Sequence, residues 1–565
     1  MKLKTLALAA TLPLALTPAA LAERGSSGHV NIIYWQAPST MNPYLSGGTK
    51  ELEAASLVLE PLARYDETGS MVPWLAESVP TVENGGVSKD LTTITWKLKP
   101  GLKWSDGSAV TSTDVVFTWT YCTHPDGGCA QNEKYNDVSQ VEALDDLTVK
   151  VIFGVPKPFP YGPFVGAQAP ILQANQFANC MGAKAPECTD ANFSPVGTGP
   201  FTVKEFRPND VISFEANQNY RDPAKPAFAT ATLKGGGDAA AAGRSVLETG
   251  EFDYAWNLQL APDVMQAMEA KGKGKVVAAF GTLVERIVIN FTNPDPALGP
   301  ERATAKHPHP ILTDLNVRKA LSMAIDRNLL VEIGYGSTGR PSCNVLPAPK
   351  IYRSTANDAC LTQDIEGAKK LLDEAGWKPG GDGVRMKDGK RLSLLYQTST
   401  NAVRQDFQAL IKQWWKEIGV ETELRNIDAS VFFGSDPGSP DTFQKFFADV
   451  EMYANNFDGT DPEAYMSNWS CKQAPRPETQ WQGNNMPRYC SEEYDGLVAE
   501  MASTGDLNER ARLAKAMNDK LMQEYVLLPL VDRGRVSAHS NTLGGVVLNT
   551  WDSELWNAAD WYRKK

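Results

Sequence analysis

Histidine is scarce in this sequence, and the motifs that arrange a catalytic nucleophile or a metal are missing. Only five histidines occur among the 565 residues. No HExxH, GxSxG or CxxC pattern is present, and no histidine stands at metal-ligand spacing from a cysteine. The acidic residues are numerous but form no recognisable hydrolase constellation. We therefore expect a protein that is not an enzyme and that uses no metal or cofactor.

Long apolar runs are also missing, apart from one at the N-terminus. Lys2 and Lys4 precede a short apolar run over residues 6–16, and Ala20-Leu21-Ala22 is a small-x-small cleavage site. This pattern is typical of a secretory signal over residues 1–22, cleaved near Ala22. No cysteine follows the site to carry a lipid, so we expect no stable membrane insertion. The mature chain is predicted to be extracytoplasmic, and periplasmic in a host with two membranes.

An excess of basic residues is absent too. Lysine and arginine number 55 against 67 acidic residues, which gives a net charge of −12. This diffuse acidic excess argues against nucleic-acid binding and against anchoring on anionic lipid. A chain of this length is too long for one hydrophobic core, so we expect two to four domains.

The eight cysteines fall into four local couples. Each couple flanks a loop-like stretch, and an exported chain meets an oxidising compartment. Eight cysteines allow 105 pairings, so proximity is the basis of this prediction, and a zinc site and free buried thiols remain alternatives. The expected disulfides are Cys122 with Cys129, Cys180 with Cys188, Cys343 with Cys360, and Cys471 with Cys490.

Hydrophobic periodicity predicts helices and strands mixed throughout, which indicates an α/β fold with an α+β portion. Thr111 and Asp114 form a capping-box-like helix start. Residues 299–310 are polar and proline-rich, so we expect an exposed insertion with solvated His307 and His309. The predicted strands are 93–98, 149–153, 420–424 and 526–531, and the predicted helices are 316–333, 364–375, 401–418 and 508–525.

The segment Gly197-Thr198-Gly199-Pro200-Phe201 is first a backbone feature. Glycine reaches dihedral angles that other residues avoid, and proline blocks the continuation of a helix. We interpret it as a tight chain crossing between domains, with direct ligand contact as the alternative. It is not a phosphate loop, because no lysine and hydroxyl residue follow the last glycine.

Three blocks in a fixed order, over residues 75–119, 196–226 and 312–336, carry a family resemblance. Together they resemble the large extracytoplasmic solute-binding proteins of ABC importers, the peptide/nickel-type family. The resemblance implies a periplasmic-binding-protein-like fold with two jaws, a hinge and an accessory lobe. It places lobe I at 29–62, 196–284 and 529–565, lobe II at 63–195, and lobe III at 285–528. It also implies a monomer that captures a solute between the jaws and hands it to a membrane permease.

A possible ligand anchor lies in residues 453–469, YANNFDGTDPEAYMSNW. Peptide-binding members of the resembled family carry an aspartate three residues before an acidic-Pro pair, and it holds the peptide's α-ammonium. That spacing selects Asp458, which is otherwise a turn residue beside Gly459. A buried ammonium needs such a counter-charge. The preceding residues would present their backbone to an extended peptide as an added strand; they are Asn455, Asn456 and Phe457.

The other end of the ligand has weaker candidates. Arg404, at the start of a predicted helix, would hold a carboxylate; the alternatives are a solvated helix-start residue and an interlobe salt bridge. Tyr34, Trp35 and Trp469 are considered as pocket walls, with plain core as the alternative. Related peptide binders bridge a loop similar to 471–490.

The function expected is therefore peptide capture by hinge closure. Within the same fold, an oligosaccharide, an opine or a metal chelate is the alternative ligand. From another class, a secreted hydrolase is the alternative function.

Overall fold

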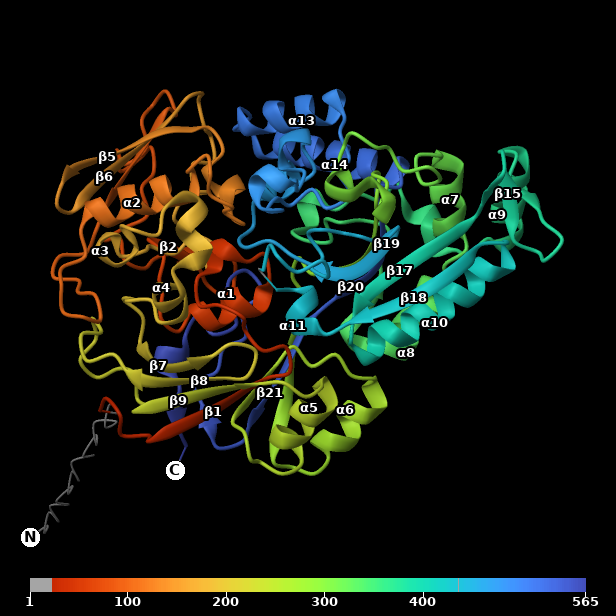
Figure 1. The fold of residues 1–565 in the computed structure, drawn as a ribbon. Helices are drawn as coiled ribbons and strands as arrows, with labels where there is room; N and C mark the ends of the chain where they lie inside the picture. Colours follow the sequence, from red (N-terminus) through yellow and green to blue (C-terminus); the bar gives the residue numbers. More distant parts are fainter. Residues whose placement is uncertain (1–22, 435, 565) are drawn as a thin grey trace, which may run out of the picture.

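The structure is a computed structural model that describes residues 23–434 and 436–564. The predicted signal segment 1–22 lies outside these residues. Within them, no helix is both long enough and apolar enough to cross a bilayer. Two large sheets and a smaller sheet occupy separate parts of the molecule (Figure 1).

The seven-stranded sheet is assembled from both ends of the chain, in the order β11-β21-β10-β1-β9-β8-β7. Alternate residues of β1 enter different cores: Ile32 and Tyr34 pack on one face, while Ile33 packs against α5 and α6 on the other. The strands are β1 (His29–Tyr34), β7 (Phe201–Arg207), β8 (Val211–Ala216), β9 (Thr230–Gly235), β10 (Tyr254–Trp256), β11 (Gly274–Ala279) and β21 (Arg535–Ser540). The helices are α1 (Thr49–Ala55), α5 (Ala239–Leu247) and α6 (Pro262–Glu269).

The six-stranded sheet has the order β13-β20-β12-β19-β17-β18 and is covered on both faces. One face packs on α7 (Leu315–Met323), α8 (Arg327–Gly334), α9 (Ile365–Glu374) and α10 (Ala402–Glu417), seen beside it in Figure 1. The other face packs on α12 (Glu463–Ser467), α13 (Glu492–Ala502) and α14 (Leu507–Gln523). The short helix α11 spans Ala429–Phe432. The strands are β12 (Val284–Ile289), β13 (Gly339–Pro341), β17 (Ser393–Ser399), β18 (Glu421–Ile427), β19 (Val450–Asn455) and β20 (Leu527–Arg533).

A smaller body surrounds the three-stranded sheet β4-β6-β5 and has its own hydrophobic core. Its helix α2 begins with the predicted capping box of Thr111 and Asp114. The bounds are β4 (Thr93–Lys97), β5 (Val138–Asp145), β6 (Thr148–Phe153), α2 (Ser112–Cys122), α3 (Ala174–Phe177) and α4 (Thr189–Phe193). Small hairpins complete the fold: β2 (Ala63–Tyr65) with β3 (Met71–Pro73), β14 to β16 between Lys378 and Arg391, and β22 (Leu543–Gly544) with β23 (Tyr562–Arg563).

The chain passes between the two large sheets after β11 and after β20. The first crossing spans residues 280–283, and the second consists of Gly534 alone. The three-lobe division remains our proposal. In the structure, β20 pairs within the six-stranded sheet as far as Arg533.

The predicted strands are confirmed, as are the predicted helices at 364–375, 401–418 and 508–525. The single helix at 316–333 is wrong. Two helices, α7 and α8, replace it, and Asp326 caps the second by accepting hydrogen bonds from the backbone of Asn328 and Leu329.

The solvated state predicted for His309 is also wrong. This residue is 2 % exposed, and its Nε2 lies 2.8 Å from an Asp449 carboxylate oxygen. Its Nδ1 accepts the backbone N–H of Leu312 at 2.8 Å. His309 therefore fastens the polar insertion to Asp449, directly before β19. His307, by contrast, is partly exposed and pairs with Glu301.

The crossing predicted at residues 197–201 is a place of close backbone contact. A Cβ on Gly197 would overlap the carbonyl oxygen of Val58, and one on Gly199 would lie 2.7 Å from that of Leu57. Glycine is needed here because no side chain fits between the two chain segments.

The four predicted disulfides are confirmed. The structure bonds Cys122 to Cys129, Cys180 to Cys188, Cys343 to Cys360, and Cys471 to Cys490. No cysteine among residues 23–434 and 436–564 is free. Each bridge joins cysteines 7 to 19 positions apart in the sequence, so it closes a local loop and does not join two bodies.

Candidate ligand-binding site between the sheets

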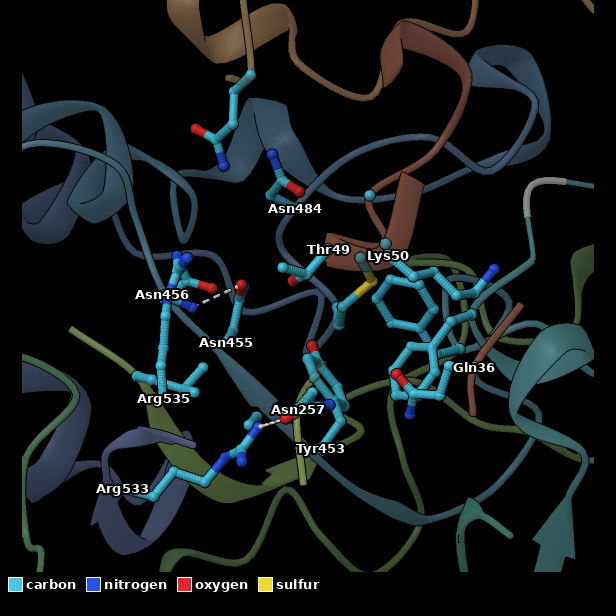
Figure 2. Close-up of a pocket in the computed structure, with 18 of the residues that line it drawn as sticks. Gln36, Thr49, Lys50, Asn257, Tyr453, Asn455, Asn456, Asn484, Arg533 and Arg535 are labelled. Atoms are coloured by element: carbon cyan, nitrogen blue, oxygen red, sulfur yellow. Dashed lines mark hydrogen bonds between the residues drawn. The ribbon is translucent and has the colours of Figure 1, made fainter. Parts of the chain in front are cut away.

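Two neighbouring cavities lie where the sheets face one another. The first measures about 90 Å³ and is lined from both large sheets and from the smaller body (Figure 2). The second measures about 440 Å³ and lies between the smaller body and the segment after β19. Glu133, Gln168, Asn456 and Asn468 line both cavities, so the two are adjacent compartments of one site.

Part of β19 presents an open strand edge to the first cavity. One edge of β19 pairs with β12 as far as Asn455. The other pairs with β17 only from Val450 to Met452. Tyr453, Ala454 and Asn455 line the cavity and meet no strand on that second edge among the described residues. An extended ligand backbone can hydrogen-bond to such an edge.

The predicted strand-adding residues divide between the two cavities. Asn455 and Asn456 line the first, where Figure 2 shows them beside each other. Phe457 lines the second, but its backbone already has a partner. The Thr282 hydroxyl donates to the Phe457 carbonyl at 2.9 Å and accepts its N–H at 3.2 Å. The free edge therefore ends before Phe457.

Asp458 lines the second cavity with an unpaired, buried oxygen. Its Oδ2 has no hydrogen-bond donor among the described residues. Burial, with the negative charge of Asp552 in support, raises the pKa of Asp458 to about 6, although Lys134 and Arg535 oppose the shift. Asn468 Oδ1 and Ser470 Oγ, in the same cavity wall, are buried and unpaired as well. A charged group with several N–H donors would satisfy this set.

Arg404 lines the first cavity but is held by another carboxylate. Its Nε donates to Glu285 Oε1 at 2.7 Å, and its Nη2 to Oε2 at 3.3 Å. The remaining Nη1 donates to Ser399 Oγ at 3.1 Å. Burial alone would raise the pKa of Glu285, but the charges of Arg404 and Arg533 outweigh it and lower that pKa. The carboxylate-binding role of Arg404 stays a prediction.

The three aromatic candidates are packed in hydrophobic cores and do not line either cavity. Tyr34 stacks on Trp256 with ring centroids 4.6 Å apart. Trp35 donates its indole N–H to the carbonyl of Asn257 at 2.8 Å. Trp469 is buried against Tyr465. Tyr34 and Trp35 support Trp256 and Asn257, which do line the first cavity.

Several lining residues have no signal in the sequence. Arg533 and Arg535 stand on either side of Gly534, at the crossing between the sheets, and Figure 2 shows both beside the cavity. Lys50, at the start of α1, is buried and paired with Glu51. Phe433, Phe443 and Tyr453 supply aromatic walls. These residues become neighbours only when the two sheets face each other.

Polar contacts close the site on the side of the smaller body. Lys157 pairs with Glu463 at 2.5 Å, and Asn136 donates to Ser467 Oγ at 3.2 Å. The Gly459 N–H donates to the Trp551 carbonyl at 2.6 Å. These contacts join residues 459–467, which follow β19, to the smaller body and to Trp551.

Gly459 is expected to be essential for this closed arrangement. Its φ is +75°, and a Cβ at this position would overlap the Tyr65 ring. In Gly459→Ala this clash should destabilise the closed state by about 1–3 kcal/mol, the usual cost of overpacking. Ligand affinity, measured by calorimetry with the solute that copurifies, should fall about tenfold to a hundredfold.

Gly383→Ala is the matched control. Gly383 also has a positive φ, +86°, but a Cβ there would meet nothing within 4 Å. It therefore shares the backbone strain without the clash and should bind as the unaltered protein does. Equal affinity of the Gly459→Ala and Gly383→Ala variants would contradict the role assigned to Gly459.

Two α/β bodies joined by short crossings, with a polar cavity between them, define a hinged binding protein. Residues 70–475 match the model of the bacterial extracellular solute-binding proteins, family 5. The chain belongs to this family. It is accordingly a solute-binding component of an ABC importer that acts outside the cytoplasm and holds its solute without converting it.

Individual relatives differ in what they bind. The chain is 28% identical over 397 residues to Protein XP55 of Streptomyces lividans, covering 68% of this chain and 64% of that protein. It is 24% identical over 509 residues to the glutathione-binding protein GsiB of Escherichia coli O157:H7, covering 90% and 89%.

The solved structure of the oligopeptide-binding protein AppA from Bacillus subtilis, in complex with a nonapeptide, is similar with a TM-score of 0.81 and 21% identity. The match covers 96% of this chain and all of that one. NikZ of Campylobacter jejuni, in complex with Ni(L-His), is similar with a TM-score of 0.77 and 21% identity, covering 95% of this chain and 100% of that one. At these identities the likeness shows the fold.

Proposed function

We propose that this protein captures peptides in the periplasm and delivers them to a membrane permease. The observation that carries the proposal is the group of unpaired, buried acceptors in the second cavity: Asp458 Oδ2, Asn468 Oδ1 and Ser470 Oγ. A peptide's α-ammonium carries a positive charge and three N–H donors. Binding it would give a counter-charge to the ligand and donors to the protein.

The open edge of β19 would hold the peptide backbone. Tyr453 to Asn455 run toward Asp458 along the chain, so a strand added at this edge ends next to the proposed ammonium site. Backbone pairing binds any peptide sequence with similar strength, while the surrounding pockets select side chains. A neutral sugar would leave the charge of Asp458 without a partner, which favours peptides over oligosaccharides as ligands.

Transport requires a cycle of closing and opening. A solute that contacts both large sheets favours the closed state, because only that state makes both sets of contacts. The crossings at residues 280–283 and at Gly534 are the hinge positions in this proposal. The closed form would then dock on the permease as a monomer.

Mass spectrometry of the copurified solute tests the proposal. Protein purified without denaturant should release intact peptides with free N-termini, and adding them back should reduce the radius of gyration in solution scattering. An oligosaccharide, opine or metal chelate in their place would contradict the peptide assignment. Hydrolysis of the added peptide would contradict a binding role without catalysis.

A further inference from the structure

A row of polar contacts joins the smaller body to the six-stranded body, which is the six-stranded sheet with its covering helices. Lys157 Nζ of the smaller body lies 2.5 Å from Oε1 of Glu463, the first residue of α12. Asn136 donates to Ser467 Oγ at 3.2 Å, and its Oδ1 accepts from Lys472 at 3.0 Å. None of these residues belongs to either crossing between the large sheets. The two bodies therefore meet directly, away from the proposed hinge.

Two disulfide-closed loops extend this contact. The loop over residues 122–129 belongs to the smaller body, and the loop over 471–490 belongs to the six-stranded body. Gln480, in the second loop, donates to the carbonyl of Asp126, in the first, at 3.3 Å. A Cβ on Gly128 would lie 3.0 Å from a backbone carbonyl oxygen of the second loop, so the two loops touch. Because each disulfide restricts its loop, the two surfaces keep their shape when they are apart.

On its other side, the smaller body is fastened to the seven-stranded sheet by buried contacts. Arg64 pairs with Asp552 at 2.8 Å, and both side chains are buried. The other Asp552 oxygen accepts the Tyr65 N–H at 3.1 Å, and Asn549 donates to the Tyr65 carbonyl at 2.9 Å. Arg535 of β21 in turn donates to the Asp552 carbonyl at 2.7 Å. Withdrawing one partner of a buried ion pair is strongly unfavourable, so the smaller body moves with the seven-stranded sheet.

The pair of Lys157 with Glu463 differs, because each charge has a second partner in its own body. Lys157 Nζ also donates to Asp137 at 2.7 Å, and Glu463 Oε2 also accepts from Arg510 at 3.0 Å. Burial alone would lower the pKa of Lys157, but Glu463 and Asp137 outweigh it and raise that pKa, so the amine stays charged. When the bodies separate, neither charge is left alone. This contact can therefore break and form again without leaving an uncompensated buried charge.

We propose that the smaller body is a clasp, which binds the six-stranded body directly and holds the site closed together with the solute. It moves with the seven-stranded sheet and brings Lys157 and the loop over 122–129 onto residues 463–484. Its contacts join parts of the protein, so they stabilise the closed state whichever solute is bound. This inference rests on the cycle of opening and closing in the proposed function, and it does not require the solute to be a peptide.

An engineered disulfide across the contact measures closure without any ligand. A Cβ on Gly505, in the turn between α13 and α14 (Figure 1), would lie 3.2 Å from Pro158 Cβ of the smaller body. This is close to the separation of about 3.5–4.5 Å in a disulfide. Neither residue lines the two cavities. The variant with Pro158→Cys and Gly505→Cys is dialysed free of solute and oxidised, and peptide mapping by mass spectrometry follows the rate at which the new bond forms.

Adding Lys157→Gln to this cysteine variant should slow cross-linking about tenfold. In the proposed cycle the solute-free protein is mostly open, and a hydrogen bond between charged groups changes its closing equilibrium by about that factor. Glu463→Gln should slow the reaction equally, and both substitutions together no further, because they remove the same contact. Lys99→Gln is the matched control. Lys99 is a part-buried lysine of the smaller body that donates to the Trp74 carbonyl of the same body at 2.7 Å, so its loss should leave the rate unchanged.

The outcomes separate the clasp from the proposed cycle. A rate that Lys157→Gln leaves unchanged overturns the clasp, and so does a cysteine pair that forms no cross-link. Losses that add in the double variant indicate general destabilisation and overturn it as well. The cycle is judged by the copurified solute, which should accelerate cross-linking when it is added back. If the solute has no effect while Lys157→Gln still slows the reaction, the solute-driven cycle fails and the clasp stands.

Discussion

Replacing Asp458 by asparagine should weaken peptide binding by about a hundredfold to several thousandfold. The substitution keeps the shape of the side chain and removes its charge, so a bound ammonium would lose its counter-charge in a buried site. Deleting one partner of a buried pair costs about 3–5 kcal/mol. Calorimetry with the copurified peptide measures the loss. Acetylating the peptide N-terminus should cause a comparable loss in the unaltered protein, and the two changes together should not add.

Asp495→Asn is the control for this substitution. Asp495 lines the same cavity, but its Oδ1 already accepts the backbone N–H of Cys471. Removing its charge should leave affinity nearly unchanged. If an acetylated peptide binds as tightly as a free one, Asp458 is not an ammonium anchor.

The pH dependence of affinity gives a second check on Asp458. Its pKa of about 6 in the unliganded protein means that the carboxyl group must lose a proton before it can pair with an ammonium. Affinity should therefore fall as the pH falls, and be about tenfold weaker at pH 5 than at pH 7. Glu133, with a pKa of about 7, titrates in the same range. The part of the slope that Asp458→Asn removes belongs to Asp458.

Replacing Glu285 by glutamine should reduce the free energy of unfolding by about 3–5 kcal/mol. Glu285 is fully buried, and it is the carboxylate that faces both Arg404 and Arg533. Without its charge, two buried guanidinium groups lose their counter-ion. Urea denaturation, followed by circular dichroism on the ligand-free protein, measures the effect.

Glu421→Gln provides the comparison at an exposed ion pair. Glu421 also pairs with an arginine, Arg391, at 2.7 Å, but both side chains are solvent-exposed. Water screens such a pair, so its loss should not change the denaturation midpoint measurably. Equal midpoint shifts for the Glu285 and Glu421 variants would contradict the importance assigned to burial.

The fold was largely predictable because its elements carry local patterns. Helix α10 shows apolar residues at helical spacing, including Val403, Phe407 and Ile411, and Gly419 follows it with a positive φ. The failure at 316–333 is instructive. Helices α7 and α8 both pack in the core of the six-stranded sheet, so the apolar spacing continues across Asp326, where the backbone turns.

The site was predictable only where its residues are neighbours in the chain. Asp458, Asn455 and Asn456 belong to one segment and do line the cavities. Arg533, Asn257 and Glu285 are far apart in sequence, and their meeting depends on how two sheets face each other. Tyr34 and Trp35 lie in hydrophobic cores for a related reason. Strand alternation sends Tyr34 and Trp35 to opposite faces of their sheet, and the cavity lies beyond its end.

In the proposed hinge motion, Gly534 is a pivot whose two neighbours, Arg533 and Arg535, line the first cavity. Arg533 before it belongs to one sheet and Arg535 after it to the other. Because Asn257 follows β10 of the seven-stranded sheet, a motion that breaks its hydrogen bond to Arg533 also opens the wall of the first cavity. The rate at which a bound solute dissociates is then the rate at which the two sheets separate. A permease that separates the two sheets would release the bound solute without contacting the groups that hold it.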